Sequence, residues 1–277
     1  MNRTAAIVIA IALLAIGGAL YLWRDRSVAP PTVPPAPSAE PTPAIVPPVA
    51  GSAIKHPIEA PDPSVSTAQL PALAQSDMVI RAELVEWLGR APVQSFLQLD
   101  DFAQHAVATL DNLGRARAPT RLWPVNPTPG RFTVMQSGDA VVMAPGNFER
   151  YAPFVAFVES VDTRRAISHY TRWYPWFQRS YEELGFPKGY FNDRVIETID
   201  QLLATPEPKA QIELKLTEVR GPVPSAQPWV RYEFADPELE ALSAGQKMLI
   251  RVGPDHARRL KAKLREVRAG LVRGAPR

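Results

Sequence analysis

The sequence predicts a mainly helical α+β protein: one globular domain preceded by a transmembrane helix and a disordered linker. Three observations support this prediction: an uncharged apolar stretch at 5–23, a proline-rich tract over 27–75, and apolar residues at helical spacing across much of the remainder. We therefore expect an N-terminal transmembrane anchor at 1–26, a linker at 27–75 and a globular helical domain at 76–277.

The overall composition excludes several classes of protein. The chain has 277 residues, 46% of them hydrophobic, which is enough for a substantial core. It has no cysteine, which excludes disulfides, thiol catalysis and cysteine-ligated metals. The formal net charge of +3 is too small to indicate a nucleic-acid partner. We predict no cofactor and no metal site.

The apolar stretch Ala5–Trp23 contains 19 residues without a charge. At about 1.5 Å per residue, a helix of this length just crosses a hydrocarbon core of roughly 30 Å. A signal peptide cleaved near Ala29 is the alternative, but Arg24, Asp25 and Arg26 separate the apolar run from that position. We expect an uncleaved single-pass anchor, with the C-terminal domain on the exported side of the membrane.

The predicted linker has a different composition. Residues 27–75 hold 13 of the 30 prolines of the chain. Proline removes a backbone donor and fixes φ, so we expect neither helix nor sheet here. A spacer between membrane and domain is the favoured interpretation, and a proline-rich ligand for a partner domain is the alternative.

The first half of the domain predicts helices around one hairpin. A helix should begin at a cap formed by Ser76 or Asp77, and a second helix at a cap formed by Asp100 or Asp101. Residues 131–145 read as a hairpin that turns at 137–139. Helices should follow from Asn147 and from Asp162, the latter kinked at Pro175.

The second half predicts a further helix opened by Asn192, then two short strands within 212–219 and 229–234. Helices over 237–251 and 255–272 should end the domain. The last helix carries Leu260, Leu264, Val267 and Leu271 on one side, surrounded by basic residues. Its basic face is either solvated or attracted to anionic lipid or an acidic partner.

Several stretches resemble a bacterial envelope family known as domain of unknown function 3014. They are "VATLDNLGR" at 107–115, "NFERYAPFV" at 147–155, "YPWFQRSYEELGFPKGYFNDRVIETIDQLLATPE" at 174–207 and "FADPELEALSAGQKMLIRVG" at 234–253. The resemblance implies an anchored protein with a proline-rich spacer. It implies no reaction, cofactor or catalytic residue.

The third of these stretches contains the candidate binding residues, which are Trp176, Tyr190, Phe191, Asn192, Asp193, Arg194, Glu197 and Asp200. The three aromatic side chains lie off the main apolar stripe, so they either form a groove for glycan or peptide or belong to the core. Asn192 is expected to cap the helix, with Asp193 at the positive end of its dipole. Arg194 is expected to pair with Glu182 or Glu183.

The acidic members of this set are spaced along one helix face. Asp193, Glu197 and Asp200 stand at i, i+4 and i+7. Three carboxylates in a row can bind a hard cation or a basic partner, although an exposed acidic stripe is more often simply solvated.

Catalytic motifs are lacking in the sequence. There is no His-Glu-x-x-His, Gly-x-Ser-x-Gly or phosphate-binding loop. We therefore expect a non-enzymatic binding or scaffolding domain with an envelope-protein or peptidoglycan partner. The alternative is a cell-wall-directed hydrolase with Asp or Glu as acid and base, which requires two carboxylates, or His169 and a carboxylate, to converge in a pocket.

Overall fold

Ten α-helices and two small antiparallel sheets make up the part of the chain that the computed structural model describes, which is 54–58, 70–208, 211–217 and 231–273. The helices are α2 (Ser76–Leu88), α3 (Arg90–Phe96), α4 (Phe102–Leu113), α5 (Gly146–Glu149), α6 (Ala152–Ser160), α7 (Thr163–Glu183), α8 (Phe191–Leu203), α9 (Pro237–Glu240), α10 (Ala244–Arg251) and α11 (Pro254–Arg273). The mainly helical α+β prediction is confirmed.

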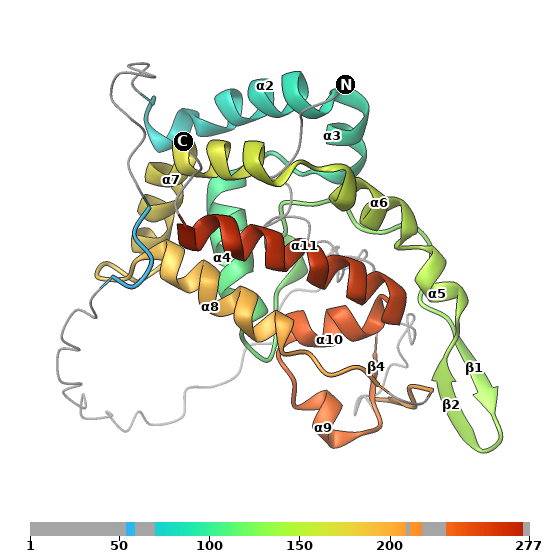
Figure 1. Cartoon of the computed structure of the whole chain (residues 1–277). Coiled ribbons are helices and arrows are strands. Elements are labelled where there is room, and N and C mark those ends of the chain that lie inside the picture. Colours follow the sequence, from blue (N-terminus) through green and yellow to red (C-terminus); the bar gives the residue numbers. More distant parts are fainter. Residues whose placement is uncertain (1–53, 59–69, 209–210, 218–230, 274–277) are drawn as a thin grey trace, which may run out of the picture.

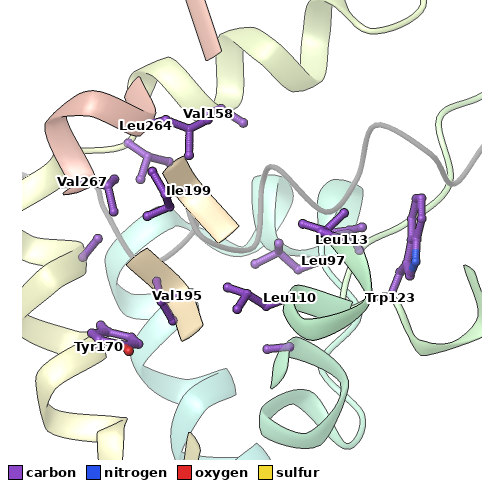
Figure 2. Close-up of a cluster of buried hydrophobic side chains, with 14 of the residues drawn as sticks. Leu97, Leu110, Leu113, Trp123, Val158, Tyr170, Val195, Ile199, Leu264 and Val267 are labelled. Atoms are coloured by element: carbon purple, nitrogen blue, oxygen red, sulfur yellow. The ribbon is translucent and has the colours of Figure 1, made fainter. Parts of the chain in front are cut away.

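The C-terminal helix α11 covers one side of the helical bundle with its apolar face. It packs against α6, α7 and α8, while α4 packs against α7 and α8 from another side (Figure 1). Leu260, Leu264, Val267 and Leu271 are all buried, as their spacing predicts. Figure 2 shows Leu264 and Val267 close to Ile199 of α8. The apolar face of the helix therefore completes the core, while its basic face is exposed.

The four strands form two separate pairs. β1 (Val134–Ser137) and β2 (Ala140–Met143) make the predicted hairpin, which extends away from the helices (Figure 1). β3 (Leu214–Leu216) pairs with β4 (Tyr232–Phe234), with Leu214 opposite Phe234. A second, smaller core forms beside the bundle from Phe132, Met143, Leu214, Phe234 and Ile250.

The helix boundaries differ from prediction where distant residues decide them. Neither Ser76 nor Asp77 caps α2, and neither Asp100 nor Asp101 caps α4 with its side chain. Instead, the Asp77 carboxylate accepts hydrogen bonds from the N–H groups of Asp101 (2.7 Å) and Phe102 (3.0 Å), at the start of α4. The side chain of Asp77 in α2 thus caps the start of α4.

Two further predictions are corrected by the structure. The helix expected over 237–251 is interrupted, because Ser243 forms a capping box with Gln246 and starts α10 afresh. The helix α3 was not predicted at all. The helix α7 continues through Pro175, whose ring lies on the exposed face.

Within the described ranges, none of the helices has the length and apolar character needed to cross a membrane. The span predicted at 5–23 lies outside these ranges. Part of the predicted linker lies inside them: 54–58 has a defined position, and a short 3-10 helix at Leu73–Gln75 precedes α2. The expectation of no fixed structure over 27–75 therefore fails for these residues.

Candidate functional site

The predicted binding residues Tyr190, Asn192 and Asp193 meet at the first turn of α8, where they contact residues 54–58. We call these three side chains the clasp. The helix begins at Phe191, with Tyr190 in the flanking position, so Asn192 is not its cap as predicted. The Asn192 side chain is instead fully buried. Figure 1 shows the segment 54–58, in blue, beside the start of α8.

The clasp binds the backbone of the segment. Asp193 accepts hydrogen bonds from the N–H of Lys55 (3.0 Å) and of His56 (2.7 Å). The Asn192 amide donates to the carbonyl oxygen of His56 (2.8 Å), and the Tyr190 hydroxyl accepts from the N–H of Ile58 (2.7 Å). Residue 57 is a proline without an N–H, so every backbone donor of 55–58 is satisfied.

The two contacts to Asp193 are the strongest part of this arrangement. A carboxylate that accepts from backbone N–H groups forms charge-assisted hydrogen bonds, worth about 1.5–3 kcal/mol each. The side chain lies in the first turn of α8, where the helix dipole favours a negative charge. Ile58 also packs against the main core, which adds an apolar contact. The clasp thus holds the main chain of a segment that bends at Lys55 and His56 and ends in the apolar Ile58.

A layer of buried polar side chains supports the clasp from below. The Tyr170 hydroxyl donates to Asn192 Oδ1 (3.1 Å), and the Tyr174 hydroxyl accepts from the Asn192 N–H (3.2 Å). Burial raises the pKa of Tyr170 and of Tyr174 well above the ordinary value, so both hydroxyls stay protonated. Gln178 accepts from the Phe191 N–H (2.8 Å). Asn192 is therefore held by residues of α7 as well as by the segment 54–58.

The remaining aromatic candidates belong to the core. Trp176 and Phe191 are both buried, so the groove interpretation is wrong for them and the core interpretation is right. Trp176 still has a role in the same region, because its indole N–H donates to the carbonyl oxygen of Pro71 (2.9 Å). Both Trp176 and the clasp thus hold chain that precedes the first helix of the bundle.

Arg194 has partners other than those predicted. Its guanidinium donates to the Asp111 carboxylate (3.0 Å), to the Asp111 carbonyl oxygen (2.9 Å) and to Glu197 (2.8 Å), rather than to Glu182 or Glu183. Asp111 is buried on α4, so Arg194 fastens α8 to α4. This role is structural.

The structure does not unite the acidic stripe into one site. Asp193 accepts from backbone N–H groups, Glu197 pairs with Arg194, and Asp200 pairs with Arg268 of α11. In the described part of the chain, no group of three or more Asp, Glu or His side chains is placed to hold a metal ion. The three carboxylates therefore act separately.

One convergence that an acid–base site would need does occur, between His169 and Glu83. Glu83 accepts from the His169 ring (3.1 Å), the Trp173 indole N–H (3.0 Å) and Arg172 (3.0 Å). Burial lowers the pKa of His169 despite the adjacent carboxylate. Trp87 stacks on the imidazole at 4.8 Å and occupies the space that a substrate would need. The cluster packs α2 against α7.

The sequence contained one signal for the peptide segment that was missed. "IKHPI" at 54–58 interrupts the Pro/Ala-rich tract with two isoleucines, a lysine and a histidine. Such a group of larger side chains within a spacer indicates a binding motif. Composition averaged over the whole tract concealed it.

Comparisons with known proteins give one match. A family model described as "Protein of unknown function (DUF3014)" matches residues 102–268, which is more than half of the chain. The search of curated proteins and the search of solved structures each found no match. The family match includes both α7 and α8, and therefore the clasp and the polar side chains beneath it. The chain belongs to this family of proteins of unknown function.

Proposed function

We propose that this protein is a binding or scaffolding domain of the bacterial cell envelope, in which the clasp is a binding site for a short peptide segment. In this proposal residues 5–23 anchor the chain in the inner membrane, and the helical domain lies in the periplasm. The segment 54–58 fills the clasp until an envelope protein presents a similar segment.

The observation that carries the proposal is the hydrogen-bond pattern of Asp193, Asn192 and Tyr190. Four hydrogen bonds to the main chain of 55–58 are formed by three side chains, of which Asn192 is held by the buried hydroxyl of Tyr170. A binding site preorganised in this way loses little entropy on association. Main-chain bonds give affinity for a segment with the same bend as 55–56, while the Pro57–Ile58 pair supplies selectivity.

The proposal is tested by direct peptide binding. A fluorescent peptide of residues 50–62 is titrated into the full-length protein in nanodiscs, with the resident segment weakened by Ile58→Asp in the protein alone. We expect saturable binding, weakened about tenfold or more by Asp193→Ala because two charge-assisted bonds are lost. Glu197→Ala, one turn further on, is the matched control and should bind normally. Absence of saturable binding, or equal binding by both variants, would refute the clasp as a peptide site.

The location is tested separately. Protease added to cells with a permeabilised outer membrane should digest the domain while the inner membrane remains intact. Protection under these conditions would place the domain in the cytoplasm and contradict the envelope part of the proposal.

A further inference from the structure

An apolar cavity lies far along α11 from the clasp, between the helical bundle and the smaller core. Its volume is about 230 Å³. Its walls include Met143 of β2, Phe148 of α5, Ile212 before β3, and Leu249 of α10. This volume exceeds the roughly 150 Å³ that holds a benzene ring in an engineered protein cavity. The cavity can therefore hold a flexible hydrocarbon chain of moderate length.

One cationic side chain, Lys261, interrupts this apolar lining. Pro254, Ala257 and Lys261 follow one another on the face of α11 that forms a wall of the cavity. Lys261 is only 6% exposed, although lysine is almost never buried without a partner. Its ammonium donates to the carbonyl oxygen of Thr205 (2.5 Å), and Thr205 is also part of the wall. The charge therefore sits at the cavity.

The charge of Lys261 is not neutralised within the described part of the chain, where no carboxylate lies within ion-pair distance of it. Four other basic residues of α11 are paired: Arg258 with Asp255, Arg259 with Glu159, Lys263 with Glu266 and Arg268 with Asp200. Glu207 lies at the exposed edge of the cavity and makes no ion pair with Lys261. An ammonium has three donors, and the single bond to Thr205 leaves donors for a ligand.

We propose that this cavity binds a medium-chain carboxylate, with the acyl chain along the apolar walls and the ionised head on the ammonium of Lys261. Burial of an unpaired charge is costly, and an anionic head group removes that cost. The apolar lining disfavours sugars and nucleotides, which need many polar partners. A ligand with one anionic group and a hydrocarbon tail matches both features of the site.

The first test compares ligands on the full-length protein in nanodiscs, with empty nanodiscs as the blank. Calorimetric titration with octanoate should show saturable binding, and decanoate should bind more tightly, by about fourfold per added methylene until the cavity is filled. Methyl octanoate has the same tail without the charge and should bind at least tenfold more weakly than octanoate. Binding of acid and ester with equal affinity, or no saturable binding of either acid, would overturn the proposal.

The second test changes the cavity. Lys261→Met keeps the apolar stem and should weaken octanoate binding about 10- to 100-fold. Ala257→Leu, which fills the cavity from the adjacent turn of α11, should also abolish binding. Lys188→Met removes an exposed lysine that does not line the cavity and is the matched control. Unchanged affinity in Lys261→Met, with the thermal unfolding transition retained, would show that the ammonium is not the head-group site.

Discussion

Some carboxylates in this protein accept hydrogen bonds from residues far away along the chain. Asp77 allows the contribution of such a contact to stability to be measured. Asp100 and Asp101 precede α4 and fit the local pattern of a cap, yet the capping oxygens come from Asp77. Asp77→Ala should destabilise the protein by about 1–2 kcal/mol in urea unfolding, because two backbone donors lose their acceptor. Asp100 is exposed and pairs with Arg81, so Asp100→Ala should cost less than about 1 kcal/mol. The reverse order would contradict this assignment.

Gly245 occupies a position where no side chain fits. A Cβ atom there would lie 2.6 Å from a Leu202 methyl carbon and 3.2 Å from the Leu113 carbonyl oxygen. Gly245→Ala should therefore force α10 away from α4 and α8 and lower the free energy of unfolding by about 1–3 kcal/mol. Gly146 has open space around its Cβ position, so Gly146→Ala is the matched control and should change stability by less than about 0.5 kcal/mol. Equal effects of the two substitutions would show that α10 packs less closely than described.

His169 makes stability depend on pH in a defined direction. Burial lowers its folded-state pKa, so the unfolded chain takes up this proton first as the pH falls below about 6.5. Protonation therefore favours the unfolded state, and the contribution of His169 to stability is lost as pH falls. His169→Gln should flatten the stability profile between neutral and mildly acidic pH in urea titrations. His105→Gln is the control; a steeper loss in His169→Gln would contradict the assigned sign.

At the scale of elements, the buried face of α11 contributes to the free energy of unfolding and its exposed face does not. Leu264 is 0% exposed, whereas Val272 near the end of the same helix is 43% exposed. Leu264→Ala should cost about 2–5 kcal/mol because it leaves a cavity against α6 and α8. Val272→Ala should cost less than about 0.5 kcal/mol. Chemical denaturation of both variants tests whether α11 is a core helix; a similar, small loss in each would place it at the periphery.

Element type was predictable from sequence where the evidence is local. The hairpin turn at 137–139, the strands around Leu214 and Phe234, and the apolar side of α11 all follow from spacing within a few residues. The helix boundaries were less predictable, because they depend on partners far along the chain. Asp77 lies 24 residues from the N–H group that it caps, and no local pattern contains that contact.

The candidate site was predicted in part, for a related reason. The residues at the start of α8 were identified, but their neighbours were not. Asp193 bonds residues 137 and 138 positions away, within a tract whose composition indicates a spacer. The basic residues of α11 illustrate the same limit: their spacing indicates a solvated or lipid-facing surface, and it cannot show that Lys261 is buried at a cavity.

At the scale of the whole molecule, the release of residues 54–58 from the clasp is a local equilibrium that is separate from global unfolding. Asp193→Ala should speed trypsin cleavage after Lys55 by about tenfold or more, because residues 54–58 leave the domain more often. The thermal unfolding transition should change little, since the bundle core does not include Asp193. Glu197→Ala is the control, and mass spectrometry of the released fragment identifies the cut. An unchanged cleavage rate in Asp193→Ala would show that the clasp does not hold the segment.

Residues 54–58 also determine where mechanical load enters the domain. A pull on the chain from its N-terminal side reaches α8 through the bonds at Asp193 and Tyr190 before it reaches α2. When those bonds part, the load passes on to α2 and the rest of the bundle. Under tension the protein would therefore unfold in two stages: the hydrogen bonds at the clasp break first, and the bundle unfolds only at a higher force.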